Sequence, residues 1–236
     1  MSLNKTLRAM GRPIRRGLFE FFGSDRYSRF ALNGLDHLLR DRIALRGGFF
    51  IEAGANDGLN QSNSYFFEKF RGWRGLLIEP LPVLAARCRI NRPRALVANV
   101  ALVGDASVKS VRIASLNLMS KVTTLFISDS AQREYEALAR SVQNLEPMEH
   151  VEAPARTLSS VLDELGICSI DLFSLDVEGY ETEVLRGLDL SRHAPVYLLV
   201  ETKVPDAILA MLGERYELVD RLTHHDYLFR LKPSAV

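Results

Sequence analysis

The strongest constraint on the fold is a series of five short apolar segments that alternate with turns and helical patterns. The apolar segments lie at residues 49–51, 75–78, 95–102, 170–175 and 196–200. Apolar residues recur at helical spacing in residues 32–45, 62–70, 83–89, 158–165 and 181–188. Short strands separated by helical crossovers form parallel sheets with helices on both faces. The pattern therefore predicts an α/β fold with a doubly wound, parallel sheet.

The C-terminal end of the chain breaks this pattern. Residues 216–219 and 227–231 have the composition of strands, and only the short turn at 220–226 separates them. Such spacing predicts a hairpin, which adds an antiparallel strand to the sheet. Ligands of doubly wound sheets bind outside the carboxyl ends of the strands. The residues that directly follow each strand are therefore the candidates for a functional site.

Charge is distributed unevenly along the 236 residues, although the formal net charge is only +1. Residues 1–46 contain ten basic and four acidic residues and carry +6, whereas the other 190 residues contain 20 basic and 25 acidic residues and carry −5. Near-neutrality of the whole argues against a nucleic-acid binder held by bulk charge. We expect a basic N-terminal arm with a helix at 1–46, attached to a mildly acidic domain at 47–236.

The cysteines and the N-terminus bear on location. Cys88 and Cys168 are too few for a disulfide scaffold and have no metal-ligand neighbours in the sequence. No run approaches the roughly 18 consecutive apolar residues of a membrane span. The first apolar patch, residues 18–22, is short and contains Glu20, so it is not typical of a signal peptide. These features favour a cytoplasmic protein without a transmembrane segment.

The first strand runs into a glycine-containing turn at residues 52–58. Gly54 and Gly58 permit a tight turn and a close approach of the backbone to a ligand. Their Gly-x-x-x-Gly spacing differs from the Gly-x-Gly-x-x-Gly of dinucleotide sites. Glu52, two positions before the first glycine, suits a ligand with a positive ammonium or sulfonium group. A purely structural strand-to-helix turn is the alternative interpretation.

Polar residues also follow the second and third strands. Glu79 ends the second strand, where a carboxylate can accept hydrogen bonds from both ribose hydroxyls of a nucleoside. It follows Gly58 by 21 residues, close to the ~20 typical of nucleotide sites. In the third strand, Asn99, Val100 and Ala101 are suited to flank an adenine ring. Core packing remains the alternative for this stretch, and a solvated surface position the alternative for Glu79.

Candidates for acid–base chemistry follow the last two parallel strands. Asp176 and Glu178 come directly after the fourth strand, where two carboxylates are costly to bury without partners. Capping of the next helix is the alternative role for Glu178. Glu201 follows the fifth strand, and His225 lies in the turn of the terminal hairpin; histidine is a common general base in enzymes. We expect the catalytic base among these four residues.

Four ordered segments carry a family resemblance: residues 50–58, 63–69, 72–80 and 174–181. Together they resemble the FkbM-type methyltransferases, and the match extends from about residue 47 to 232. Arg156, Thr157 and Leu158 also lie where the family has them, before the fourth strand. The resemblance implies a Rossmann-like class I methyltransferase fold with a seven-stranded sheet. It also implies methyl transfer from S-adenosylmethionine (SAM), usually to hydroxyl groups of sugars or natural products. Residues 114–150 match loosely, and we expect them to form an insertion that covers the substrate.

The resemblance further implies a cofactor site. The residues expected around the methionine part of SAM are Glu52, Gly54, Asn56, Asp57 and Gly58, with Asn63 also in the cofactor site. Glu79 is expected to hold the ribose beside Pro80, Asn99 to Ala101 to lie by the adenine, and Asp176 to border the transferred methyl group. Aspartate is common in the family at the position of Glu52, and the extra methylene should be tolerable.

Several aspects of partners and mechanism stay open at this stage. We predict a reaction that uses no metal. A divalent cation stays an open alternative, because Asp176, Glu178 and Glu201 offer the hard oxygen ligands that such ions prefer. The expected acceptor is a small molecule or glycan, and the basic arm leaves open an anionic or lipid-linked one. Nucleic acid is not expected, and a homodimer stays open. The alternative functions are a non-catalytic nucleoside-cofactor-binding protein and an NAD-dependent oxidoreductase.

Overall fold

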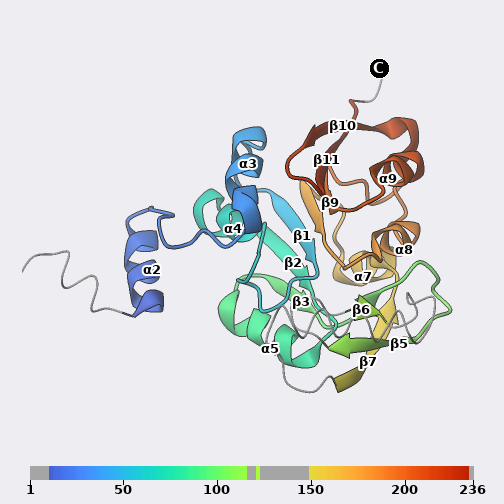
Figure 1. Ribbon diagram of the computed structural model, residues 1–236, viewed down its shortest axis with the longest axis horizontal. Coiled ribbons are helices and arrows are strands. Elements are labelled where there is room, and N and C mark those ends of the chain that lie inside the picture. The colour runs from blue at the N-terminus through green and yellow to red at the C-terminus, as the bar shows by residue number, and fades with distance from the viewer. Residues whose placement is uncertain (1–10, 116–120, 123–148, 234–236) are drawn as a thin grey trace, which may run out of the picture.

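The computed structural model describes residues 11–115, 121–122 and 149–233 (Figure 1). Its larger sheet has seven strands in the order β10-β11-β9-β8-β1-β2-β3. These are β1 (Phe49–Ala53), β2 (Arg74–Ile78), β3 (Leu96–Ala98), β8 (Leu172–Leu175), β9 (Tyr197–Glu201), β10 (Tyr216–Arg221) and β11 (Asp226–Leu231). All neighbours pair in parallel except those of β11. The predicted parallel sheet with a terminal antiparallel hairpin is confirmed.

Helices cover both faces of this sheet. The described helices are α2 (Arg12–Phe21), which lies to one side of the molecule, η1 (Leu32–Gly34), α3 (Leu35–Arg42), α4 (Tyr65–Arg71), α5 (Pro82–Asn91), α7 (Leu158–Leu165), α8 (Glu181–Arg186), α9 (Pro205–Leu212) and η4 (Gly213–Arg215). Successive strand residues point to opposite faces. Accordingly, Phe50 of β1 packs with residues of α3, α4 and α5, while Ile51 packs with residues of α7, α8 and α9. The doubly wound architecture is therefore confirmed as well.

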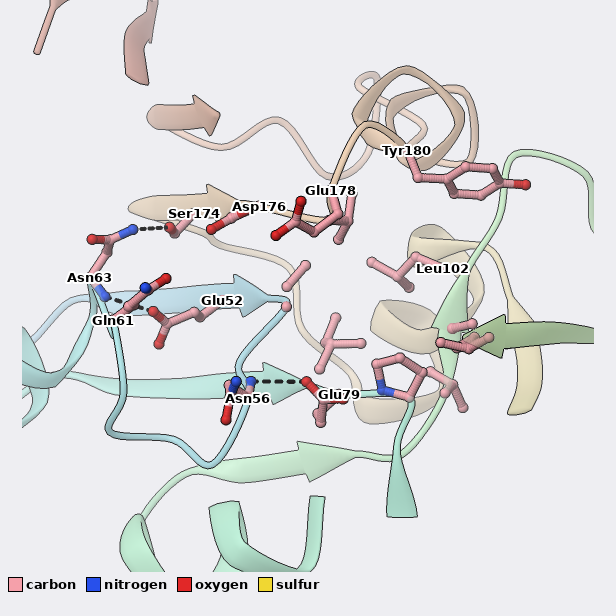
Figure 2. A pocket seen from close by; sticks show the side chains of 18 of the residues that line it. Glu52, Asn56, Gln61, Asn63, Glu79, Leu102, Ser174, Asp176, Glu178 and Tyr180 are labelled. Atoms are coloured by element: carbon pink, nitrogen blue, oxygen red, sulfur yellow. Dashed lines mark hydrogen bonds between the residues drawn. The ribbon is translucent and has the colours of Figure 1, made fainter. Parts of the chain in front are cut away.

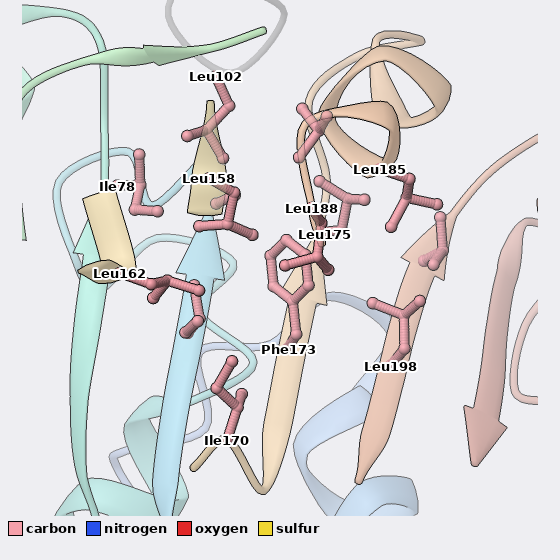
Figure 3. Close-up of a cluster of buried hydrophobic side chains, with 14 of the residues drawn as sticks. Ile78, Leu102, Leu158, Leu162, Ile170, Phe173, Leu175, Leu185, Leu188 and Leu198 are labelled. Atoms are coloured by element: carbon pink, nitrogen blue, oxygen red, sulfur yellow. The ribbon is translucent and has the colours of Figure 1, made fainter. Parts of the chain in front are cut away.

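The core cluster on the α7–α9 face fixes where the strands end. Phe173 of β8 and Leu198 of β9 pack there with Leu158 and Leu162 of α7 (Figure 3). All four side chains are fully buried. Strands held on both faces in this way keep their carboxyl ends in register, so the segments that follow β1, β2 and β8 meet at one edge.

A second, four-stranded sheet follows the third parallel strand. Its order is β4-β7-β5-β6, with β4 (Ala101–Leu102), β5 (Ser110–Ser115), β6 (Lys121–Val122) and β7 (Glu149–Arg156). The prediction of one strand over residues 95–102 was wrong, because β3 and β4 belong to different sheets. The side-chain amide of Asn99 donates from Nδ2 to the carbonyl oxygens of Glu79 (2.8 Å) and Pro80 (2.9 Å). The chain turns at Asn99 between β3 and β4, so that Ala101 pairs with β7.

Other boundaries differ for local reasons. The helix predicted at 32–45 covers only α3, because Asn33 and Gly34 have positive φ angles and Ile43 is extended. The helix predicted from Ser62 begins at Tyr65, although the Ser62 hydroxyl does accept a hydrogen bond from the Tyr65 amide (3.2 Å). The expected edge hairpin at 108–113 contains β5, which pairs with both β6 and β7.

The predicted domain limits stay predictions. Within the predicted arm, Leu39 and Ile43 are buried in the cluster that also contains Phe67 of α4. Of the insertion expected at 114–150, the structure describes only the strand residues 114–115, 121–122 and 149–150. The prediction that this insertion covers the substrate lies mostly outside the described residues.

A buried arginine holds the loop between β1 and α4. Arg92 follows α5, and only 1% of its surface is exposed. Its guanidinium donates to Glu68 Oε2 (2.6 Å), to the carbonyl oxygen of Gly58 (3.0 Å), and to the hydroxyls of Ser62 (3.1 Å) and Ser64 (3.1 Å). One guanidinium therefore fixes both ends of residues 58–64.

Glu52 completes this network from the strand side. Its carboxylate accepts hydrogen bonds from Ser62 Oγ (2.9 Å), the Asn63 amide (2.7 Å) and Ser64 Oγ (2.6 Å). Arg92 lies 3.9 Å away and balances the buried negative charge. A buried charge requires such partners, because isolating it from water costs many kcal/mol. The loop is thus held by ionic contacts rather than by an apolar core.

The network predicts a large loss of stability for Arg92→Met. This substitution keeps an apolar side chain but leaves Glu52 and Glu68 buried without a cation, which should lower the free energy of unfolding by about 3–5 kcal/mol. Denaturant titration measures the change. The matched control is Arg89→Met on the exposed side of α5, expected to change stability by less than about 0.5 kcal/mol. Equal stabilities of the two variants would contradict the assigned role.

A close backbone approach at Gly54 generates a second prediction. Gly54 has φ +81°, and a Cβ there would lie 1.8 Å from the carbonyl oxygen of Asp176. Gly54→Ala should therefore cost more than about 3 kcal/mol, because neither backbone segment can move without disturbing the sheet. Gly72 also has positive φ (+70°), but its Cβ would meet nothing within 4 Å. Gly72→Ala should cost only about 1 kcal/mol, and similar losses in both variants would refute the close-approach explanation.

Candidate active site

A cavity opens at the carboxyl ends of β1, β2 and β8. It encloses about 950 Å³ of space, including the solvent at its mouth. The polar or charged residues that line it are Glu52, Asn56, Asn60, Gln61, Asn63, Glu79, Ser174, Asp176, Glu178 and Tyr180. Figure 2 shows Asp176 and Glu178 along one side, Glu79 and Asn56 along the opposite side, and Leu102 with Tyr180 at the end away from Asn63. The cavity lies where a doubly wound sheet binds its ligands.

The lining is acidic. Glu52, Glu79, Asp176 and Glu178 contribute carboxyl groups, and no lysine, arginine or histidine lines the cavity among the described residues. Carboxylates in a partly enclosed space produce a negative potential that favours cationic ligands. The cavity is therefore suited to a ligand with a positively charged group and poorly suited to a polyanion.

Glu79 is almost fully enclosed, with 5% of its surface exposed. One carboxylate oxygen accepts from the Asn56 amide (2.8 Å) and the other from the Leu81 amide (3.0 Å). Burial raises the pKa of Glu79 to about 7, and the two amide hydrogen bonds oppose the rise. Each oxygen retains a further lone pair, so the ionised group can accept two hydroxyl donors from a ligand.

Asp176 lies in a group of acids at the end of β8. Burial, followed by the charges of Glu201, Glu178 and Glu181, raises the pKa of Asp176 well above its usual range. A hydrogen bond between the side chains of Asp176 and Glu201 acts in the same direction. Neighbouring carboxylates and burial both disfavour the ionised form of Asp176.

Backbone strain is concentrated around the cavity. Asn56 (φ 50°), Gln61 (φ 60°) and Glu178 (φ 56°) have positive φ, and all three line the cavity. Among the residues that the structure describes, Asn33 is the one other non-glycine residue with positive φ. Such conformations cost free energy and persist where the surroundings enforce them, often at ligand sites. The clustering supports a functional use of the cavity.

One side of the cavity is apolar. Its members are Ile78, Pro80, Val100, Ala101, Leu102 and Ile113. Ala101, Leu102 and Ile113 come from β4 and β5, so the second sheet forms part of the cavity. Apolar side chains together with a few hydrogen-bonding groups are suited to a ring system that carries polar substituents.

The predicted cofactor residues fall into two groups. Those that line the cavity are Glu52, Gly54, Asn56, Asn63, Glu79, Pro80, Val100, Ala101 and Asp176. Asp57, Gly58 and Asn99 lie behind the lining. Asp57 accepts from the amides of Leu59 (2.9 Å) and Asn60 (2.8 Å), while Asn99 holds the Glu79–Pro80 turn. Direct ligand contact by these three stays a prediction, and their visible contacts shape the turns.

The predicted catalytic residues are divided in the same way. Asp176 and Glu178 line the cavity, whereas Glu201 and His225 lie outside its described lining. His225 Nε2 is 3.6 Å from Glu201 Oε1 and 3.6 Å from Asp226 Oδ2. These three side chains each offer a ligand atom within 4.8 Å of the others, an arrangement able to hold a cation. The prediction of no metal remains a prediction.

Sequence reasoning missed several cavity residues. Asn60 and Gln61 lie between two of the predicted motifs, and Ser174 and Tyr180 lie within the motif at 174–181, but none of the four was predicted as a site residue. Ser174 could have been found from strand alternation, because it lies two residues before Asp176 on β8. The side-chain nitrogen Nδ2 of Asn63 donates to Ser174 Oγ (3.1 Å), while the buried Asn63 Oδ1 has no partner among the described residues. A buried polar atom without a partner is unusual, and a bound ligand would explain it.

Comparison with known proteins agrees with this geometry. No curated protein matches the chain. Among solved structures, the chain is similar to a TehB-like SAM-dependent methyltransferase from Corynebacterium glutamicum, with 14% identity, a TM-score of 0.41, and coverage of 93% of this chain and 96% of that one. The model of the methyltransferase FkbM domain matches residues 52–229, well over half of the sequence. The chain therefore belongs to the FkbM methyltransferase family.

Proposed function

We propose that this protein transfers a methyl group from SAM to a hydroxyl group of a sugar, glycan or other natural product. The observation that carries the proposal is the acidic cavity, which has four carboxyl groups and no basic side chain in its described lining. A sulfonium and an ammonium group both carry positive charge, so a ligand with these groups suits that potential. Family membership supports methyl transfer as the reaction class.

The residues present fit this cofactor. Glu79 has two lone pairs directed away from its amide donors for ribose hydroxyls, and the unpartnered Asn63 Oδ1 can accept from an ammonium group. The apolar wall that includes Val100 and Leu102 suits an adenine ring. When bound, SAM supplies a methyl group already activated by its sulfonium. The protein is left to orient the acceptor and to manage its proton.

Asp176 is the proposed base for the acceptor hydroxyl. It is the acid at the end of β8, half-buried in the cavity wall, and its backbone lies close to Gly54, where a side chain would collide with it. A hydroxyl becomes a better nucleophile when a positioned carboxylate accepts its proton. Glu178 lines the same side, where it can hydrogen-bond the acceptor. We assign Glu201 and His225 a positioning role behind Asp176, because neither reaches the described lining.

The rival functions are weaker on the same observations. A nicotinamide dinucleotide carries an anionic pyrophosphate, which the four cavity carboxyls would repel. Its usual glycine motif is also absent from residues 52–58. A non-catalytic protein that binds a nucleoside cofactor shares the same cavity. An assay for methyl transfer to an acceptor distinguishes the two, because only the enzyme catalyses the transfer.

The raised pKa of Glu79 predicts a pH-dependent affinity for S-adenosylhomocysteine. Ribose hydroxyls donate to the ionised carboxylate, so binding favours loss of its proton. With a free-state pKa of about 7, affinity should fall about tenfold between about pH 8 and about pH 6, because the proton must leave before the ligand binds. Isothermal titration calorimetry at several pH values measures this.

Glu79→Gln should remove this pH dependence and weaken binding about tenfold or more at high pH. Glu214→Gln makes the same chemical change at an exposed position outside the cavity lining and should behave like the unmodified protein. An affinity that falls equally with pH in Glu79→Gln would mean that another group is responsible.

Asp176→Asn should abolish turnover while leaving cofactor binding nearly intact. Loss of a general base typically costs about 10²–10⁴-fold in rate. Release of S-adenosylhomocysteine is followed with a panel of saccharides and natural-product alcohols, in the presence of EDTA because the proposed transfer uses no metal. The control is Asp206→Asn, an exposed position on α9. Unchanged turnover in Asp176→Asn would eliminate this base, and cofactor binding without transfer to any acceptor would favour the non-catalytic alternative.

A further inference from the structure

The N-terminal helix α2 presents an exposed apolar face. Ile14, Leu18 and Phe21 lie four and three residues apart along the helix, and Phe22 follows directly after it. Their exposed fractions are 61%, 38%, 84% and 75%. Residues at this spacing lie on one side of a helix. These four side chains form what we call the α2 apolar face, a contiguous surface of the kind that marks an interaction site.

The opposite side of α2 is anchored, so this face cannot turn inwards. Glu20 accepts hydrogen bonds from Ser28 Oγ (2.6 Å) and Tyr65 OH (2.7 Å), and Lys69 Nζ lies 3.0 Å from it. The Phe19 ring packs edge-on against Tyr27 at 4.8 Å. Figure 1 shows α2 at one side of the molecule, next to α3 and α4. The anchors leave the α2 apolar face directed away from the domain.

The segment that carries this face is basic. The first 46 residues carry +6, and the rest of the chain carries −5. Arg26 is exposed beside Tyr27, and Arg29, with its side chain 57% exposed, is paired only with Asp25 at 3.7 Å among the described ion pairs. An apolar helix face within a basic segment is typical of helices that lie in the plane of a membrane interface.

We propose that α2 docks the protein on an anionic phospholipid surface. Phe21, Phe22 and Leu18 enter the boundary between headgroups and acyl chains, and the arginines of the arm contact the lipid phosphates. A second copy of the chain fits this face less well, because it would bring two arms of +6 together. No described helix is long and apolar enough to cross a bilayer.

The anchor also connects α2 to the cavity. Tyr65, which donates to Glu20, follows cavity residue Asn63 by two positions. The docking proposal does not depend on the proposed methyl transfer, since it rests on α2 alone.

Vesicle co-sedimentation tests the proposal with the full-length chain. The probe is phosphatidylcholine containing about one third phosphatidylglycerol, compared with pure phosphatidylcholine. We expect binding to the anionic vesicles that weakens with salt, and at least about tenfold weaker partitioning of the triple variant Leu18→Ser/Phe21→Ser/Phe22→Ser. The matched control is Val83→Ser/Ile90→Ser, which removes two exposed apolar residues of α5 (67% and 78%) and should bind as the unmodified chain does.

Two further measurements decide between the outcomes. Affinity for S-adenosylhomocysteine should be the same in the triple variant, which shows that the cavity is intact and separates this proposal from the methyltransferase proposal. Absence of binding to anionic vesicles at low salt, or equal binding by the triple variant, would overturn the proposal. A dimer in light scattering that the triple variant loses, without vesicle binding, would identify a second copy as the occupant and overturn it as well.

Discussion

The buried guanidinium of Arg92 is the interaction on which the cavity depends. It lies among Glu52, Glu68 and the 58–64 loop, and it supplies the cation that lets two carboxylates remain buried. A network of this kind adds little net stability compared with apolar packing, but it tolerates the removal of no single member. Hydrogen bonds are directional, so the network fixes the conformation of the loop, whereas apolar contacts would permit it to slide. Asn60, Gln61 and Asn63 line the cavity and belong to this loop, so the network also fixes that part of the cavity wall.

The same network uses most of the hydrogen-bonding capacity of Glu52, whose contact with a ligand stays a prediction. Glu52 lines the cavity, yet its oxygens already accept three hydrogen bonds from the loop. Glu79 and Asp176 differ, because Glu79 has only two backbone donors and Asp176 faces other acids. The cavity thus contains one acid with a structural task and two whose protonation is poised by burial. A division of this kind separates loop placement from ligand chemistry.

Sequence reasoning predicted the sheet and the cavity edge because both follow from local patterns. Apolar strands, helical spacing and the acid after each strand can be read within about ten residues of each other. The split of residues 95–102 could not be predicted, since an apolar run looks the same in one strand or in two. Helix α9 did carry a signal, a proline at its start and helical spacing after it. Arg92 carried none: a lone arginine between asparagine and proline is typical of a surface, and its burial depends on carboxylates distant in sequence.

The near-zero net charge conceals two surfaces of opposite sign. The cavity is acidic and the N-terminal arm is basic, and screening in physiological salt limits each field to roughly 8–10 Å. The two fields therefore act on different molecules without cancelling. A domain of −5 approaching an anionic bilayer would be repelled, unless a basic segment lay between them. Helix α2, anchored through Glu20 beside the cavity loop, is placed to supply that segment while leaving the acidic cavity open to a cationic cofactor.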